Sequence, residues 1–158
     1  MPEALHKDEG VREETTKEIL SQLKPAFKPD GVITAGNSSQ ISDGAAALLL
    51  VSEDILNKFN LEPIAKIKSM AVVGTDPVLM LSGPIPATRK ALDQAKLKPE
   101  DINLAEINEA FSSVVGAWRK EFPEINYENV NANGGSIAIG HPLGCLLYTS
   151  PSPRDRSI

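Results

Sequence analysis

Aromatic residues and cysteine are both scarce in this sequence. Only 4% of its 158 residues are aromatic, so the core is predicted to be aliphatic and rich in alanine. The single cysteine, Cys145, excludes an internal disulfide framework and fits a reducing compartment. We therefore expect a cytoplasmic protein that is stabilised by apolar burial.

Long apolar runs and clusters of positive charge are missing as well. No stretch approaches the roughly 20 apolar residues that span a bilayer, and Met1 to Glu9 lack a signal-peptide pattern. The net charge is −5 and no basic run stands out, which argues against a nucleic-acid surface. The 41% of hydrophobic residues suits a globular chain that binds neither membranes nor nucleic acids.

Helices are predicted where apolar residues recur with a helical period. Thr15 and Glu18 form a capping box at the start of a short helix that ends before Pro25. Residues 52–59 are also helix-like. Two longer helices are predicted from apolar stripes. The first runs from Pro84 to Ala95, and its stripe consists of Ala87, Ala91, Leu92 and Ala95. The second begins at Glu109, and its stripe consists of Phe111, Val114, Val115, Trp118 and Phe122.

Extended segments alternate with these helices. Residues 45–51 form a continuous apolar run, residues 64–73 alternate apolar positions with lysines, and antiparallel pairing of the two is expected. Residues 102–107 and 130–132 are predicted as further strands. The order helix, strand, helix, strand from Pro84 onward indicates a parallel sheet with covering helices, so the fold class is α/β.

The most informative stretch runs from Asn131 to Gly144 and reads Asn-Ala-Asn-Gly-Gly-Ser-Ile-Ala-Ile-Gly-His-Pro-Leu-Gly. Its glycines let backbone amides approach a ligand closely. Pro142 suits the first position of a helix, which places His141 at or beside the cap. A neutral imidazole held there can act as a base or a hydrogen-bond donor. A lone His-Pro would be only a capped turn, but so many residues of this kind together favour a functional site.

Asn108 begins a second candidate motif, Asn-Glu-Ala-Phe, where a predicted strand ends and a helix begins. Open α/β sheets hold ligands at such strand ends. Asn108 could simply cap the helix, or its amide could hold a water molecule over the site. His141 lies at a similar predicted junction, and two junctions on one sheet face can converge. Residues 36–39 form a cluster that is typical of a turn.

These two motifs carry a family resemblance. The segment from Gly134 to Gly144 strongly resembles the histidine motif of thiolases, the acyl-CoA C-acyltransferases, and the Asn108 quartet resembles their motif whose asparagine positions a catalytic water. The resemblance runs from about Asp8 to Gly144. It implies that residues 36–39 lie near the active site, so a simple turn and a part of the site both stay open for them. It implies a thiolase-like layered fold, with helices packed on mixed β-sheets, that is incomplete here. Residues 1–76 would end the N-terminal half, and residues 77–144 would begin the C-terminal domain.

The resemblance also implies chemistry. A thiolase transfers acyl groups between 3-ketoacyl-CoA or acetyl-CoA and CoA, by thiolytic cleavage or Claisen condensation, as in fatty acid β-oxidation. His141 and Asn108 would be catalytic, and CoA would be a substrate, with no bound cofactor and no metal. The complete enzyme would be a homodimer or homotetramer. Substrate contacts would come from Ser69, Ala110, Phe111 and Gly140, although Ser69 equally fits a small inward residue and Phe111 fits the core better.

The sequence departs from the thiolase pattern in two ways. Neither the nucleophilic cysteine nor the family's second cysteine motif has a match, so the chain by itself is expected to be inactive. Cys145 lacks the context of both motifs. Residues 145–158 resemble the translation of a transposase adapter from sequencing libraries and are predicted to be a non-native tail without regular structure.

Two other functions compete with a thiolase. A ketoacyl-synthase-like condensing enzyme would carry a second histidine in place of Asn108. A noncatalytic module that binds acyl-CoA or lipid would have no need to bring Asn108 and His141 together.

Overall fold

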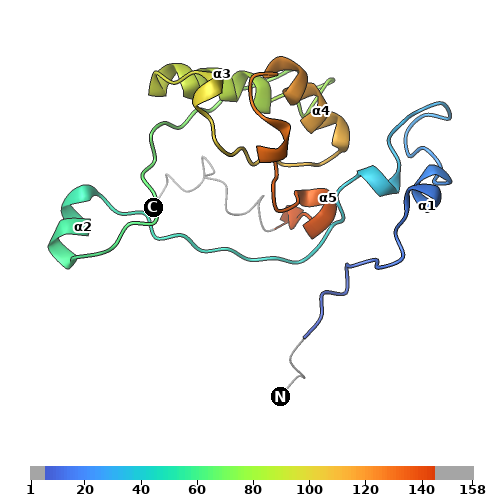
Figure 1. Ribbon diagram of the computed structural model, residues 1–158, viewed down its shortest axis with the longest axis horizontal. Helices are drawn as coiled ribbons and strands as arrows, with labels where there is room; N and C mark the ends of the chain where they lie inside the picture. The colour runs from blue at the N-terminus through green and yellow to red at the C-terminus, as the bar shows by residue number, and fades with distance from the viewer. Residues whose placement is uncertain (1–5, 145–158) are drawn as a thin grey trace.

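The structure is a computed structural model, and it describes residues 6–144. The predictions for Cys145 and the tail therefore lie outside the described residues. The described chain contains five α-helices and three short 3₁₀ helices, which are shown in chain order in Figure 1. They are α1 (Lys17–Ser21), η1 (Ala35–Asn37), α2 (Glu53–Phe59), α3 (Pro84–Ala95), η2 (Pro99–Asp101), α4 (Ser112–Glu121), η3 (Tyr127–Asn129) and α5 (Ser136–Ile139).

Helices α3 and α4 pack against each other and confirm the two longer predicted helices (Figure 1), although α4 begins at Ser112 and not at the predicted Glu109. Leu92 is the buried residue of α3, while Val115 and Trp118 are buried in α4. The indole N–H of Trp118 donates to the Thr88 hydroxyl at 2.9 Å. Thr88 in turn donates to the carbonyl of Pro84 at 2.7 Å, so a polar chain joins the two helices inside the apolar contact.

The core of the described chain surrounds Trp118, which is 2% exposed. The buried cluster adds Phe122, whose ring centroid lies 5.1 Å from that of Trp118. The prediction of an aliphatic, alanine-rich core is thus wrong at its centre, because the few aromatic residues are concentrated there. Aliphatic side chains complete the cluster, namely Val115, Ile125 and Val130, with Ile85, Ile102, Ala105 and Ile107 packed around it.

Helix α1 begins one residue later than its predicted capping box. Thr16, not Thr15, is the N-cap, and its hydroxyl accepts from the amide of Ile19 at 3.3 Å. The hydroxyl of Thr15 instead donates to the carbonyl of Arg12 at 2.9 Å, so it cannot serve the helix. A capping box that sequence reasoning missed begins η1, where the side chains and amides of Thr34 and Asn37 bond reciprocally.

The predicted strands are not formed in the described part of the chain. Residues 45–51 form an irregular segment that leads to α2 (Figure 1). Neither this segment nor residues 64–73 form a β-bridge, so the expected antiparallel pairing is wrong. Within residues 102–107 and 130–132, pairing is limited to one parallel bridge between Ala105 and Val130. A strand exists only through hydrogen bonds to a neighbouring strand. Among the predicted strands, only the segments around Ala105 and Val130 find such a neighbour in the described residues.

Candidate active site

Asn108 is exposed and contacts the glycine-rich loop through Ser136. The Ser136 hydroxyl donates to Oδ1 of Asn108 at 2.8 Å, across 28 positions in sequence. Asn108 is not a helix cap, because α4 begins at Ser112 and its N-cap residue is Phe111. The simple explanation of Asn108 as a cap is therefore wrong, and its side chain is available to the site.

Residues 38–42 run between the Asn108 motif and His141. At one end the amide of Ser39 donates to the carbonyl of Ala110 at 3.0 Å. At the other end the amide of His141 donates to the carbonyl of Gln40 at 2.7 Å, and the amide of Ser42 donates to that of His141 at 3.2 Å. The same short segment thus bonds to both motifs. The stretch at 36–39 is a turn and also borders the candidate site, so the two interpretations of it are compatible.

His141 is half-buried and forms a parallel bridge with Ile41. Its Nδ1 atom is buried and has no hydrogen-bond partner among the described residues.

The backbone before His141 can be formed only by glycine. Gly140 has φ +87° and ψ 169°, a conformation that other residues avoid. A Cβ atom added to Gly140 would also collide with the hydroxyl of Ser42. Ser42 and Gly140 therefore pack closely, and this contact fixes the direction in which the chain enters His141.

Helix α5 precedes His141, where the predicted strand-to-helix junction requires the end of a strand. Residues Ser136–Ile139 form one helical turn, so His141 does not follow a strand. The first turn is held by tertiary contact, since the amide of Ile137 donates to the carboxylate of Glu109 at 3.2 Å. The helix predicted to begin at Pro142 falls mostly outside the described residues.

Asn131 and Glu109 connect the two motifs beneath the candidate catalytic side chains, and sequence reasoning missed both. Asn131 is the buried polar residue of the described chain. Its side chain accepts from the amide of Ile107 at 2.7 Å and donates to the carbonyl of Ile107 at 2.9 Å. It also donates to Glu109 Oε1 at 2.9 Å. The available signal was only that Glu109 follows Asn108 and that Asn131 opens the glycine-rich loop.

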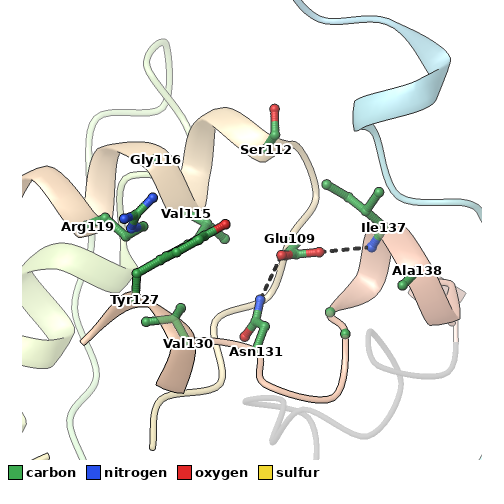
Figure 2. A pocket seen from close by; sticks show the side chains of 12 residues that line it. Glu109, Ser112, Val115, Gly116, Arg119, Tyr127, Val130, Asn131, Ile137 and Ala138 are labelled. Atoms are coloured by element: carbon green, nitrogen blue, oxygen red, sulfur yellow. Dashed lines mark hydrogen bonds between the residues drawn. The ribbon is translucent and has the colours of Figure 1, made fainter. Parts of the chain in front are cut away.

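A cavity of about 420 Å³ lies beside this network (Figure 2). Glu109 and Asn131 line it together with the first turn of α5, and the dashed lines in Figure 2 mark the two bonds to Glu109. On another side the guanidinium of Arg119 lies 3.2 Å above the ring of Tyr127. Neither Asn108 nor His141 lines this cavity.

Ser69 lies elsewhere in the described structure. Its hydroxyl donates to the carbonyl of Ala91 in α3 at 2.8 Å, and it lines a second cavity of about 400 Å³ that shares no residue with the first. Phe111 packs edge to face on Phe27, with ring centroids 5.5 Å apart. The structure therefore brings Ala110, Phe111 and Gly140 to the Asn108 and His141 region through residues 38–42, but it does not bring Ser69 there.

Within residues 6–144, no group of three or more histidine, cysteine, aspartate or glutamate side chains could hold a metal ion. No helix in the range is long and apolar enough to cross a membrane.

Comparison with known families identifies the class of protein that carries this site. The family model described as thiolase, C-terminal domain, matches residues 61–146, and the model described as thiolase, N-terminal domain, matches residues 2–54. The chain belongs to the thiolase family. The α/β fold class follows from this membership, although the described residues form only bridges in place of a sheet.

Curated relatives agree with this assignment. The chain is 52% identical over 144 residues to a 3-ketoacyl-CoA thiolase of Marinobacter nauticus, an alignment that covers 89% of this chain and 37% of the relative. It is 50% identical over 141 residues to the 3-ketoacyl-CoA thiolase FadA of Escherichia coli K12, covering 87% and 36% respectively. The chain thus spans little more than a third of the length of the relatives that it matches.

Solved structures give the same result. Human mitochondrial 3-ketoacyl-CoA thiolase superimposes with a TM-score of 0.82 at 43% identity, over 89% of this chain and 36% of the human one. The human enzyme is also known in complex with CoA. The acetyl-CoA acetyltransferase of Bacillus anthracis matches with a TM-score of 0.83 at 46% identity, over 88% of this chain and 35% of that one.

Proposed function

We propose that the full-length enzyme containing this chain transfers acyl groups between 3-ketoacyl-CoA or acetyl-CoA and CoA. The observation that carries the proposal is the shared contact of both motifs with residues 38–42, together with the bond between Ser136 and Asn108. A noncatalytic binding module would have no reason to join the Asn108 and His141 segments in this way. A ketoacyl-synthase-like enzyme is disfavoured because asparagine, not histidine, occupies position 108.

The residue types fit this chemistry. A cysteine thiolate from another part of the enzyme takes the acyl group, which is covalent catalysis, and a neighbouring imidazole makes the thiolate less costly to form. The departing acetyl-CoA develops enolate charge on its thioester oxygen, which needs hydrogen-bond donors. His141 would donate directly, and Asn108 would act through a water molecule held by its exposed amide.

The remaining assignments follow from the same proposal. Acyl-CoA and CoA are the proposed ligands, with Ala110, Phe111 and Gly140 close to them. Ser69 would contact CoA only if the complete enzyme extends the site toward α3. The boundary between the halves is proposed at Asp76 and Pro77. A cytoplasmic location and a homo-oligomeric enzyme are proposed as well.

Alanine variants at the two candidate catalytic positions test the proposed function in the full-length enzyme. Removing one oxyanion donor costs roughly 100- to 1000-fold in rate. His141→Ala should therefore lower kcat by at least about 100-fold more than Asn108→Ala, because solvent can partly replace the water that Asn108 holds. Both variants should lower kcat more than they weaken CoA binding. Turnover of acetoacetyl-CoA and CoA affinity are measured for each.

His6→Ala provides the matched control, since His6 is exposed and lies outside both motifs in the sequence. It should leave turnover unchanged. Near-parental turnover of His141→Ala would contradict the proposed function and leave the histidine as a structural residue. Retained CoA binding by a parent enzyme without any turnover would favour the binding module.

A further inference from the structure

Asn108 and its neighbour Glu109 bind different parts of the same loop. Asn108 accepts from the side chain of Ser136 at 2.8 Å. The carboxylate of Glu109 accepts from Asn131 Nδ2 at 2.9 Å and from the amide of Ile137 at 3.2 Å. The glycine-rich loop is thus held at its start, through Asn131, and at the first turn of α5, through Ile137.

Asn131 makes this attachment rigid. Both hydrogens of its amide are used, one on the carbonyl of Ile107 and one on Glu109, while its oxygen accepts from the amide of Ile107. The residue is 9% exposed and has φ +49°, a left-handed conformation that asparagine tolerates better than most residues. A saturated, buried amide has one orientation only, so Glu109 is held in place as well.

Gly135 shows how closely the parts fit. A Cβ atom added there would collide with the carboxylate of Glu109 and would lie 2.6 Å from Asn131 Nδ2. The loop backbone therefore passes directly over the bond between Glu109 and Asn131. Figure 2 shows the carboxylate between the Asn131 side chain and the start of α5.

Helix α5 transmits this attachment to His141. The helix has only four residues, Ser136–Ile139, and Gly140 and His141 follow it directly. The amide of Gly140 donates to the carbonyl of Ser136 at 3.0 Å, so the far end of α5 is bonded to its first residue. A shift of α5 would therefore move His141. Glu109 directly follows Asn108 in the sequence, so the bond from Glu109 to α5 connects the position of His141 to that of Asn108.

We infer that Glu109 is a positioning residue, which sets the separation of Asn108 and His141 by holding Asn131 and the first turn of α5. The inference rests on the proposed function, because it assigns Glu109 a role in the same reaction. On this inference Glu109 acts through Asn131 and α5, and not through a contact with the reacting atoms. Its effect should consequently appear in the rate of the chemical step and not in the binding of CoA.

Glu109→Gln in the full-length enzyme is the first test. Both neighbours of the carboxylate are N–H donors, so the new amide group must place its own NH₂ against one of them. A misplacement of about 1 Å can cost on the order of 100-fold in rate, and we expect kcat to fall roughly 10- to 100-fold. The KM for CoA should change less than about twofold, since the contacts that bind CoA equally in the ground state and the transition state are retained.

Exchange of the acid and the amide gives a rescue test. Asn131→Asp alone places two carboxylates side by side and should lower kcat at least as far as Glu109→Gln. In the double variant Glu109→Gln/Asn131→Asp, the amide at 109 can donate to the carboxylate at 131 and still accept from Ile137. The double variant should recover at least about tenfold in kcat over Asn131→Asp, which a general loss of stability would not produce.

The pH dependence of Asn131→Asp covers the case in which Glu109→Gln does not fold. Adjacent carboxylates raise the pKa of one of them, and a shared proton restores a donor between positions 109 and 131. Its kcat relative to the parent should therefore rise as the pH falls from about 8 to about 6. Arg119 and Tyr127 are the other ionisable residues that line this cavity, and both are present in the parent and in the variant.

Glu124→Gln is the matched control, because Glu124 is exposed and has no hydrogen bond to any residue within 6–144. It should retain parental kcat. The inference is overturned if Glu109→Gln keeps parental kcat, or if kcat and CoA affinity fall together and the double variant shows no rescue. Where Glu109→Gln cannot be obtained, a pH-independent ratio for Asn131→Asp overturns it. Parental activity of His141→Ala would instead refute the proposed function, so the two failures are distinguishable.

Discussion

Gly140 and Gly116 show how differently one residue type is used in this chain. Gly140 has a positive φ and packs against Ser42, so both its backbone and its missing side chain are required. Gly116 lies inside α4, and a Cβ added there would meet nothing within 4 Å. The first glycine is required by the site, whereas the second only weakens a helix.

Alanine at these two positions should therefore have opposite effects on the full-length enzyme. Gly140→Ala should destabilise it by about 1–3 kcal/mol of backbone strain, with additional cost from Ser42, and should lower turnover. Gly116→Ala should stabilise α4 by about 0.5–1 kcal/mol and leave turnover unchanged. Thermal melts and acetoacetyl-CoA turnover are the measurements. Equal melting temperatures for the two variants would contradict the prediction.

At the scale of elements, α3 and α4 form the one helix pair whose packing supports the core of the described chain. Trp118 contributes most, because it fills the interface and also donates to Thr88. An ion pair between Arg89 and Glu121 crosses the same interface at the surface. Exposed ion pairs contribute only about 0–1 kcal/mol, so the apolar contact dominates.

Trp118→Ala should consequently cost about 3–5 kcal/mol, the usual range for a buried tryptophan. Hydrogen exchange in the full-length enzyme should show lost amide protection in both α3 and α4, since each helix packs on the other. Lys120→Ala, an exposed position in the same helix, is the control and should leave protection unchanged. Loss of protection restricted to α4 would show that α3 is stabilised independently.

The extended segments behave differently from these helices. Residues 45–51 and 64–73 have the apolar composition and alternation of strands, yet no bridge forms on either in the described chain. Helix hydrogen bonds close within a few residues, whereas a strand needs a partner that other parts of the chain must supply. The same difference explains why pairing between the predicted strands is limited to the bridge of Ala105 with Val130, in the segments flanking α4.

The whole molecule exposes far more surface than a compact protein of its size. Its accessible surface is 13639 Å², while a compact monomer of 16.9 kDa exposes about 7,700 Å². Large apolar side chains contribute to the excess. Among the most exposed are Leu48 (87%), Leu49 (81%), Ile64 (102%), Val72 (86%) and Val78 (88%). Exposed apolar surface of this extent strongly favours association with other molecules.

The isolated 158-residue chain is therefore expected to aggregate or to remain partly unfolded. Size-exclusion chromatography with light scattering and a thermal melt would test this, with a full-length thiolase as the control. The double variant Leu48→Lys/Leu49→Lys should reduce the association, because it adds charge to the exposed apolar segment at residues 45–51. A monodisperse monomer with a cooperative melt would contradict the prediction.

The sequence by itself determined the features that depend on nearby residues. The spacing of apolar residues was enough to locate α3 and to place Val115, Trp118 and Phe122 on one buried stripe of α4. The motifs at Asn108 and at Gly134 to Gly144 were enough to identify the thiolase family. Both inferences succeed because helical periodicity and motif spacing are local properties of a chain.

Only the tertiary structure decided how these parts meet. The amide of Ile137 in α5 donates to the carboxylate of Glu109, which is 28 positions away in sequence. The buried side chain of Asn131 accepts from the amide of Ile107, which is 24 positions away. Hydrogen bonds across such separations leave no periodic trace in the sequence, because either partner taken alone resembles an ordinary polar residue of a turn. For the same reason, the apolar residues at 45–51 and 64–73 predicted strands from their composition but could not show which segment each strand would pair with.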